Sequence, residues 1–330
     1  MNYSDILEYA EEAGIKHLSY GKTDKIEGIS NKYPFFLISF IPYSLQGKEK
    51  YISDRACADI APFAQANHYA ELTARFKKLV SAICIKTGYK KADFRIFSNS
   101  PFPEKQMAVK SGLGVMGKNG LIINKTYGSY ISIGGVLLPF IPKGLPEMQY
   151  NSPGCDKDKE TWDDYRQQEN TPLCKTCAAC ITACPTKAIT EKGLQKERCI
   201  QYYASTHTIV PQEIMEKWGT TLYGCPHCQA ACPHNRKDLQ EREKISLGRI
   251  GSTLPLDILI SSSPEHIKQL IKKSTLASSW LDTKTLIRNA IIVAGYLRCK
   301  SLSPAIEEHT HSHDSVIRDA ATWAKKQIAN

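Results

Sequence analysis

Apolar positions in the first part of the chain switch between helical and strand spacing. Residues 1–20 carry apolar side chains three or four positions apart, which predicts a helix that Gly14 ends. Residues 34–42 are an apolar run bounded by prolines, which is typical of a buried strand. Helical spacing returns over residues 68–87. These periods predict a helix, a strand and a second helix in this order.

The same alternation continues toward residue 150. Residues 94–97 predict another strand, and a short helix then ends in the glycine turn at 112–114. Two further β-rich stretches cover 120–124 and 129–138. The sequence therefore predicts an α/β domain over residues 1–150, within a chain of the α+β class.

The second half of the chain begins with polar segments and ends with helices. Residues 143–172 are polar and rich in turn formers, which predicts a linker, and the charged stretch 236–244 predicts a solvated helix face. Asp282 and Asp314 can each cap an amphipathic helix. Paired helices of this kind predict a HEAT-like helical domain over residues 241–330.

Composition adds two constraints. The 330 residues contain no apolar run of about 18, so no membrane-spanning helix is expected. The start of the sequence lacks the pattern of a signal peptide, so we expect a cytoplasmic protein with reduced thiols. Twelve cysteines then favour metal ligation over disulfides.

A formal charge of +10 favours a polyanionic partner such as RNA, although surplus surface lysine would give the same number.

Eight cysteines follow the spacing of iron–sulfur proteins and predict a ferredoxin-like domain over residues 151–240. Two motifs end in Cys-Pro, and one further cysteine lies between them; the eight are Cys174, Cys177, Cys180, Cys184, Cys199, Cys225, Cys228 and Cys232. In ferredoxin runs the last cysteine of a motif ligates the other cluster. One [4Fe–4S] cluster therefore takes Cys174, Cys177, Cys180 and Cys232, and the second takes Cys184, Cys225, Cys228 and, by elimination, Cys199.

Two alternative interpretations of these glycines and cysteines carry less weight. A pair of structural zinc sites also uses Cys-x2-Cys, but the triple motif closing with Cys-Pro is a cluster spacing. The letters Gly112-x-Gly114-x-x-Gly117 match a dinucleotide-binding turn, yet they follow a helix and not a strand. We interpret them as a turn.

Several segments together resemble the epoxyqueuosine reductase family along almost the whole chain. They are residues 111–119, Tyr127-Gly-Ser-Tyr130, both cysteine motifs with Leu222-Tyr-Gly-Cys225, and Ile287-Arg-Asn-Ala290. The resemblance implies a reductase that uses cobalamin and iron–sulfur clusters to reduce epoxyqueuosine to queuosine in tRNA. It also implies an N-terminal corrinoid-binding domain, an anticodon stem-loop as partner, and an external electron donor such as flavodoxin or ferredoxin. We expect a monomer.

The resemblance also implies which residues lie near the corrinoid. The positions that match are Ser98, Asn99, Lys118, Asn119, Ile122, Ile133, Ser205 and Pro226.

One departure from the family falls at the expected proton donor. The family has an aspartate where this chain has Ser98, and a serine hydroxyl is a far weaker acid than a carboxyl. A second family segment in the same expected active-site region also departs from the family and is Asn67-His68-Tyr69 in this chain. Three interpretations stay open: His68 or Tyr69 supplies the proton, the enzyme reduces another substrate on the same cofactor, or the protein is a noncatalytic corrinoid-binding electron-transfer protein.

Overall fold

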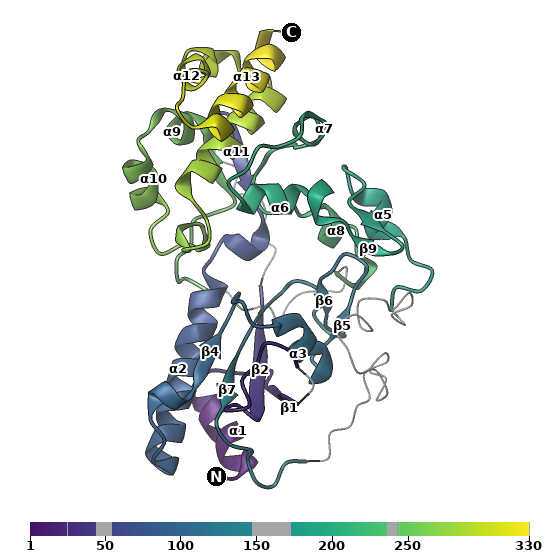
Figure 1. Cartoon of the computed structure of the whole chain (residues 1–330), viewed down its shortest axis with the longest axis vertical. Coiled ribbons are helices and arrows are strands. Elements are labelled where there is room, and N and C mark those ends of the chain that lie inside the picture. Colours follow the sequence, from purple (N-terminus) through teal and green to yellow (C-terminus); the bar gives the residue numbers. More distant parts are fainter. Residues whose placement is uncertain (25, 44–54, 147–172, 236–242, 244, 330) are drawn as a thin grey trace.

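The structure is a computed structural model that describes residues 1–24, 26–43, 55–146, 173–235, 243 and 245–329 (Figure 1). The predicted linker over 143–172 and the charged stretch 236–244 lie almost entirely outside these residues. In Figure 1 the N-terminal sheet lies at the bottom, the C-terminal helices lie at the top, and the cysteine-rich segment lies to one side.

A four-stranded antiparallel sheet forms the centre of the N-terminal part. Its strands are β1 (Ser19–Lys22), β2 (Phe35–Pro42), β7 (Ile131–Leu138) and β4 (Arg95–Phe97), in the order β1-β2-β7-β4. All of β2 is buried, because alternate side chains such as Phe35 and Phe36 enter the cores on its two faces. Two covered faces explain the uninterrupted apolar run, and the predicted strand is confirmed.

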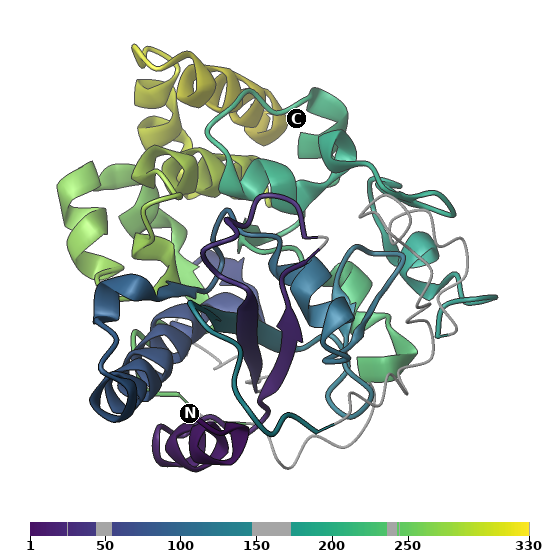
Figure 2. The same ribbon diagram turned by 60° about the horizontal axis from the view of Figure 1, so that its bottom comes forward.

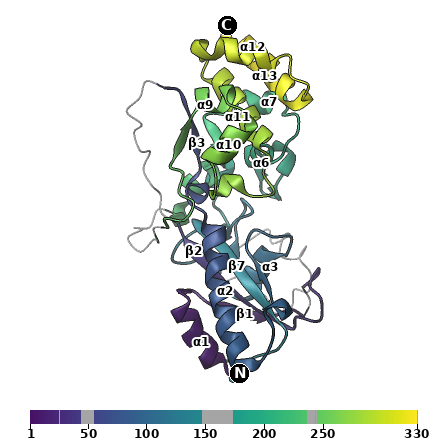
Figure 3. The same cartoon turned by 90° about the vertical axis from the view of Figure 1, so that its left-hand side faces the viewer.

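Helices cover both faces of this sheet. The helices α1 (Tyr3–Glu12) and α2 (His68–Thr87) pack against each other and onto one face, while α3 (Glu104–Lys110) packs onto the other (Figures 2 and 3). The predicted helix over 68–87 is confirmed. It begins after Asn67, whose side chain accepts a hydrogen bond from the Ala70 amide, and it ends at left-handed Gly88.

The helix predicted near the start of the chain is confirmed with its end at Gly14, which has a left-handed backbone with φ of 78°. The residues after Gly14 are not helical, although the predicted segment extended to residue 20. The last helical residue is Glu12, and Ser19–Lys22 forms the edge strand β1, which pairs with β2. Gly21 lies directly against the ring of Phe36, where a Cβ would be 2.6 Å from the nearest ring atom. Pairing with a strand some 15 residues further along therefore overrides the local helical period.

A second sheet ties the N-terminal segment to the C-terminal half. Strand β3 (Cys57–Ile60) lies between β10 (Thr221–Tyr223) and β11 (Thr253–Pro255). Residues of β3 share one hydrophobic core with the segment 200–223 and with the C-terminal helices. The predicted boundary at 240/241 thus separates segments that pack together, and the three-domain division stays a prediction.

The C-terminal part is helical, as predicted. Its helices are α9 (Leu256–Ser261), α10 (Pro264–Leu270), α11 (Thr283–Tyr296), α12 (Ser303–His309) and α13 (Ser315–Ala329). The side chain of Asp282 caps α11, and that of Asp314 accepts hydrogen bonds from the first amides of α13. The two helices pack closely, since Gly295 lies against Ala324.

The cysteine-rich segment consists of short elements. They are α5 (Ala179–Ala183), β8 (Ile189–Thr190), β9 (Gly193–Leu194), α6 (Ile200–Ser205), α7 (Gln212–Met215) and α8 (His227–Ala230). The hairpin of β5 (Val115–Met116) and β6 (Ile122–Ile123) contacts this segment from the N-terminal side. Short 3-10 helices occupy Pro62–Ala64, Lys91–Asp93, Lys196–Arg198, Pro233–Asn235, Thr275–Ala277 and Lys300–Leu302. None of the described helices is both long enough and apolar enough to cross a membrane.

Candidate cluster and cofactor site

The buried motif cysteines belong to two separate hydrophobic clusters. Cys174 and Cys232 are buried together against Val115 and Ile123 of the β5–β6 hairpin. Cys184 is buried with Ala188 and Ile189, and Cys199 and Cys228 pack against it. The helices α5 and α8, which carry Cys180 and Cys228, are neighbours. Loops far apart in sequence thus bring the thiols together.

Electrostatic coupling between thiols follows the same grouping, except that Cys180 of the first group also acts on Cys228 of the second. Burial, then Cys174, Cys232 and Cys177, raises the pKa of Cys180 to about 11. In the second group burial, then Cys225 and Cys199, raises the pKa of Cys228 to about 12. A thiol whose pKa rises because other thiols surround it is stabilised as a thiolate once iron supplies positive charge. Each group therefore fits one cluster, and the ligand assignment stays a prediction.

Local hydrogen bonds also fit a bound cluster. Burial acts to raise the pKa of Cys184, but hydrogen bonds from Thr186 and Ala188 lower it below the ordinary value. The Ala188 amide lies 3.2 Å from the Cys184 Sγ. Among the described residues, no three His, Cys, Asp or Glu side chains converge on a single metal ion. A [4Fe–4S] cluster presents a separate iron to each cysteine, so its thiols need no common centre.

A cavity of about 440 Å³ lies between the second thiol group and the N-terminal sheet. Its cluster-side wall contains all four thiols of that group and none of the first; it is formed by Cys184, Thr186, Cys199, Ser205, Cys225 and Cys228. Its sheet-side wall is formed by Asn99, Lys105, Asn119, Leu121, Ser129 and Ser132. Its aromatic end is formed by Tyr43, Phe63, Tyr69, Tyr223 and Trp280. This volume is typical of a ligand site.

The two walls are joined by buried polar side chains. The Gln229 amide donates to the Tyr43 hydroxyl and to the Ser129 carbonyl, both at 3.0 Å. The Asn235 amide donates to the Ser129 Oγ at 2.9 Å, and its Oδ1 accepts from the Ser129 amide at 2.7 Å. Because buried amides are costly to leave unpaired, these contacts fix the spacing of the walls.

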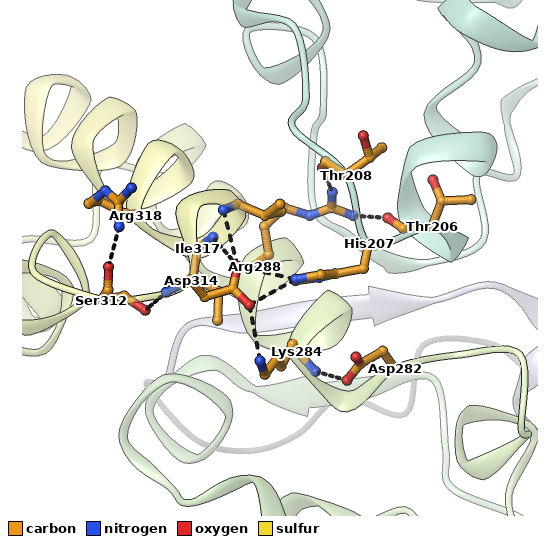
Figure 4. A network of polar contacts seen from close by, with 11 residues as sticks. Thr206, His207, Thr208, Asp282, Lys284, Arg288, Ser312, Asp314, Ile317 and Arg318 are labelled. Carbon is orange, nitrogen blue, oxygen red and sulfur yellow. Dashed lines mark hydrogen bonds and ion pairs between the residues drawn. The ribbon is translucent and has the colours of Figure 1, made fainter.

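A further network fixes the cluster-side wall to the C-terminal helices (Figure 4). The fully buried guanidinium of Arg288 donates to carbonyl oxygens of Tyr203, Thr206 and Thr208. The His207 Nε2 lies 3.0 Å from Asp314 Oδ2. Together these contacts hold the chain after α6, the helix that follows its N-cap Cys199 and ends at Ser205.

Ser98 does not line the cavity. Its Oγ donates to the Ile133 carbonyl at 2.9 Å, and its side chain lies against Gly134. The neighbouring Asn99 does line the cavity and has a left-handed backbone with φ of 51°. Glu104 holds this loop, because its carboxylate accepts hydrogen bonds from the Asn99 and Ser100 amides and from the Ser100 Oγ.

The two other proposed catalytic side chains are placed differently from each other. His68 is buried beside Tyr43, and its Nδ1 lies 3.1 Å from the Phe63 carbonyl oxygen. Burial lowers the pKa of His68, which favours the neutral ring. Tyr69 lines the cavity, and burial raises the pKa of its phenol. Only Tyr69 of the three residues Ser98, His68 and Tyr69 therefore reaches the cavity.

The predicted cofactor residues are also divided. Asn99, Asn119 and Ser205 line the cavity. Lys118 points away, since its Nζ pairs with Glu191 at 2.7 Å and donates to the Cys177 carbonyl near the first thiol group. The remaining three, Ile122, Ile133 and Pro226, do not line it: the two isoleucines belong to the sheet core and the proline precedes α8.

Sequence reasoning missed the aromatic end of the cavity. Tyr43, Phe63, Tyr223 and Trp280 come from four separate segments, so no spacing links them. The one sequence signal was Trp280 itself, because a tryptophan just before the helix cap Asp282 has no place in the apolar period of α11.

The cysteine segment defines the class of the protein. Residues 173–235 match the family described as 4Fe-4S double cluster binding domain. The predicted pair of iron–sulfur clusters is thereby confirmed at the level of the domain.

Comparison of the whole chain gives the particular relatives. The epoxyqueuosine reductase of Lactococcus garvieae is 29% identical over 229 residues, which are 68% of this chain and 58% of that protein. The chain thus matches little more than half the length of this curated relative. Epoxyqueuosine reductase from Bacillus subtilis, solved with its catalytic aspartate loop swung out of the active site, matches with a TM-score of 0.75 and 23% identity over 98% of this chain and 90% of that one.

A third relative is an epoxyqueuosine reductase solved with an epoxyqueuosine-modified tRNA-Tyr stem loop. It matches with a TM-score of 0.74 and 21% identity over 99% of this chain and 90% of that one. The resemblance seen in the motifs is therefore confirmed: the chain is similar in sequence to epoxyqueuosine reductases and shares their fold.

Proposed function

We propose that this protein is a cobalamin- and [4Fe–4S]-dependent reductase that converts epoxyqueuosine to queuosine in tRNA. The observation that carries the proposal is the cavity, because all four thiols of the second group line one of its walls. A cluster held there lies directly beside whatever the cavity binds. The sequence similarity to epoxyqueuosine reductases supports this substrate.

The two thiol groups then have different roles. The group of Cys174, Cys177, Cys180 and Cys232 does not line the cavity, so it receives electrons from an external donor such as flavodoxin or ferredoxin. The group of Cys184, Cys199, Cys225 and Cys228 passes them into the cavity. Cys180 of the first group is among the charges that raise the pKa of Cys228 in the second, and α5 and α8, which carry them, are neighbours; both observations support transfer between the groups.

The cavity also fits a corrinoid. Its walls combine apolar side chains such as Leu121 with hydrogen-bonding side chains of Asn99, Asn119 and Ser205, which suits a large ring with polar edge groups. Bound cobalamin supplies cobalt redox chemistry that no side chain offers. The protein's part is to position it against the cluster-side wall. In domain terms, 1–150 binds the corrinoid, 151–240 holds the clusters and 241–330 is the helical repeat.

We propose Tyr69 as the proton donor. Removing the oxygen of an epoxide takes two electrons and two protons and releases water, so the site must supply a proton to the departing oxygen. Among the described residues that line the cavity there is no aspartate or glutamate, whereas the Tyr69 phenol lines it in its protonated form. A neutral O–H group is a donor at neutral pH.

A second candidate function rests on the same loop. Ser98 stands where the family's aspartate is expected, and its hydroxyl donates a hydrogen bond to the Ile133 carbonyl. This arrangement favours a related reductase that acts on a different substrate with the same cofactors. The second candidate differs from the first only in what occupies the cavity beside the corrinoid.

One experiment separates these possibilities. Anaerobic protein with reconstituted clusters and cobalamin is incubated with a chemical reductant and epoxyqueuosine-containing tRNA, and queuosine is measured by mass spectrometry of nucleosides. We expect queuosine to form in proportion to enzyme, and Cys199→Ser to abolish it while Cys84→Ser does not. Cobalamin binding with no queuosine would overturn the proposal in favour of the second candidate. Loss of cobalamin binding would overturn both and leave an electron-transfer protein.

A further inference from the structure

The aromatic end of the cavity contains an exposed tryptophan. Of the three tryptophans in the part of the chain that the structure describes, Trp218 and Trp323 are 0% and 7% exposed, whereas Trp280 is 42% exposed. A large apolar side chain at the mouth of a cavity, and not in the core, is characteristic of a binding surface.

Trp280 is held in a defined orientation. Its indole N–H lies 3.4 Å from the Tyr223 hydroxyl, and its ring meets Tyr69 edge to face, with centroids 5.9 Å apart and planes at 78°. Tyr223 in turn packs against Phe63. These two contacts hold the indole in place while 42% of the residue stays exposed, so the ring can serve as a platform.

Two exposed lysines lie in the segment that precedes Trp280. Lys272 and Lys273 are exposed, and the Lys273 carbonyl accepts a hydrogen bond from Asn67, two residues before Tyr69. Lys284 follows Trp280 by four residues, but its ammonium pairs with Asp314 at 3.2 Å, so it is not counted with them. An apolar ring flanked by lysines fits one kind of ligand in particular, a planar base joined to a phosphate backbone.

We propose that Trp280, backed by Tyr69 and Tyr223, is the platform on which a base extruded from an RNA loop stacks as it enters the cavity. Lys272 and Lys273 contact the adjoining phosphates. This inference rests on the proposed function, because it takes the substrate to be a modified base within a tRNA loop. A base that leaves its stack needs a new stacking partner, and Trp280 stands at the entrance where the partner is required.

The test compares two RNA ligands on the cluster- and cobalamin-loaded protein. One is an anticodon stem-loop with epoxyqueuosine at the wobble position, and the other has an abasic site there. We expect Trp280→Ala to weaken binding of the first about tenfold, as for loss of one stacked base, and to leave binding of the second unchanged. Trp280→Phe keeps a ring and should retain most of the preference. Tyr296→Ala, an exposed aromatic residue outside the cavity, is the control.

Each outcome has a definite meaning. Equal loss for both RNAs, or loss for neither, would overturn the platform while leaving the proposed function standing. If Trp280→Ala instead loses cobalamin, seen in the visible spectrum, the ring serves the corrinoid and the inference is wrong. Failure of the unaltered protein to bind either RNA would overturn both the platform and the tRNA substrate. If Trp280→Ala does not fold, Trp280→Phe against Trp280→Leu makes the same comparison.

Discussion

The two walls of the cavity differ in how strictly their chemistry depends on individual residues. On the cluster-side wall, four cysteines from three separate loops share one task, and each cluster iron needs its own thiolate. On the sheet-side wall, the loop before α3 contributes Asn99 but not the neighbouring Ser98, and Tyr69 of the aromatic end faces the same space. We therefore expect electron delivery to require a complete ligand set, and we expect proton supply to be able to pass to another side chain nearby.

The largest effect is expected from removing one cysteine ligand of the second cluster. Cys199→Ser should cost one cluster, which lowers iron from about eight to about four atoms per chain, and should bring queuosine formation to background. Iron and acid-labile sulfide analysis checks the first result and nucleoside analysis checks the second. Cys84→Ser, in α2 and outside both groups, is the matched control. Full iron content in Cys199→Ser would show that another group is the fourth ligand.

The next effect tests whether proton supply has moved to Tyr69. Tyr69→Phe removes the hydroxyl and keeps the ring, so we expect a loss of about 10²–10⁴-fold in kcat with clusters and cobalamin still bound. Single-turnover queuosine formation is the measurement. Tyr43→Phe is the control for a general effect of losing a hydroxyl. It removes a different phenol of the aromatic end, the one that accepts a hydrogen bond from the Gln229 amide. A Tyr69→Phe enzyme of unchanged rate would mean that another group, such as Tyr223 or His227 of the same lining, supplies the proton.

The cluster-side wall was the more predictable from sequence. Thiolate spacing is set by the geometry of a cluster, so a motif such as Cys174-x2-Cys177 has the same meaning in any fold. Long periodic elements were predictable for a similar reason. Residues 68–87 and the helix after Asp282 appear where their apolar period and caps placed them, because burial of one helix face follows directly from that period.

The sheet-side wall and the aromatic end were less predictable, because long-range contacts assemble them. Residues 19–22 became a strand only because β2 was available to pair with them. Trp280, Tyr223 and Tyr69 meet across more than 200 residues of sequence. The direction in which a side chain faces could not be predicted from the sequence either. Lys118 and Asn119 are adjacent, yet only Asn119 lines the cavity. No local pattern records which of two neighbours faces a site.

A smaller effect concerns the loop of the sheet-side wall. Glu104→Ala removes the acceptor of three hydrogen bonds from residues 99 and 100, so we expect a loss of about 2–3 kcal/mol in the free energy of unfolding. Burial raises the pKa of Glu104, although the bonds from Ser100 and Asn99 oppose this. A raised carboxyl pKa means that the folded state binds its proton more tightly, so ionisation costs stability as the pH rises through the folded pKa.

A neutral acceptor avoids that cost. Glu104→Gln keeps an oxygen for the amides of Asn99 and Ser100, so it should lose less than about 1 kcal/mol at pH 7. Urea unfolding of both variants measures the difference. Equal losses for alanine and glutamine would show that the charge, and not the hydrogen-bond acceptor, holds the loop.

The smallest effect concerns the support behind the cluster-side wall. Burial acts to raise the pKa of Asp314, but hydrogen bonds from His207 and Lys284 lower it to about 2. A depressed carboxyl pKa gives stability that is present above pH 4, near the unfolded value, and is lost as the pH falls toward 2. Above that window Asp314→Asn should be less stable by about 1 kcal/mol, a value discounted because solvent screens these side chains.

A double-mutant cycle at pH 7 isolates this contact without acid, which would also attack the clusters. We expect His207→Gln and Asp314→Asn to be non-additive by about 0.5–1 kcal/mol in thermal unfolding, because each removes the same interaction. Lys325→Ala, whose ion pair with Glu307 lies on the outer helices, should add independently to either variant. Additive effects of His207 and Asp314 would mean that their contact does not support the cluster-side wall. The wall would then be held to α11 by buried Arg288 and by Asn289, whose amide donates to the Ala204 and Leu222 carbonyls.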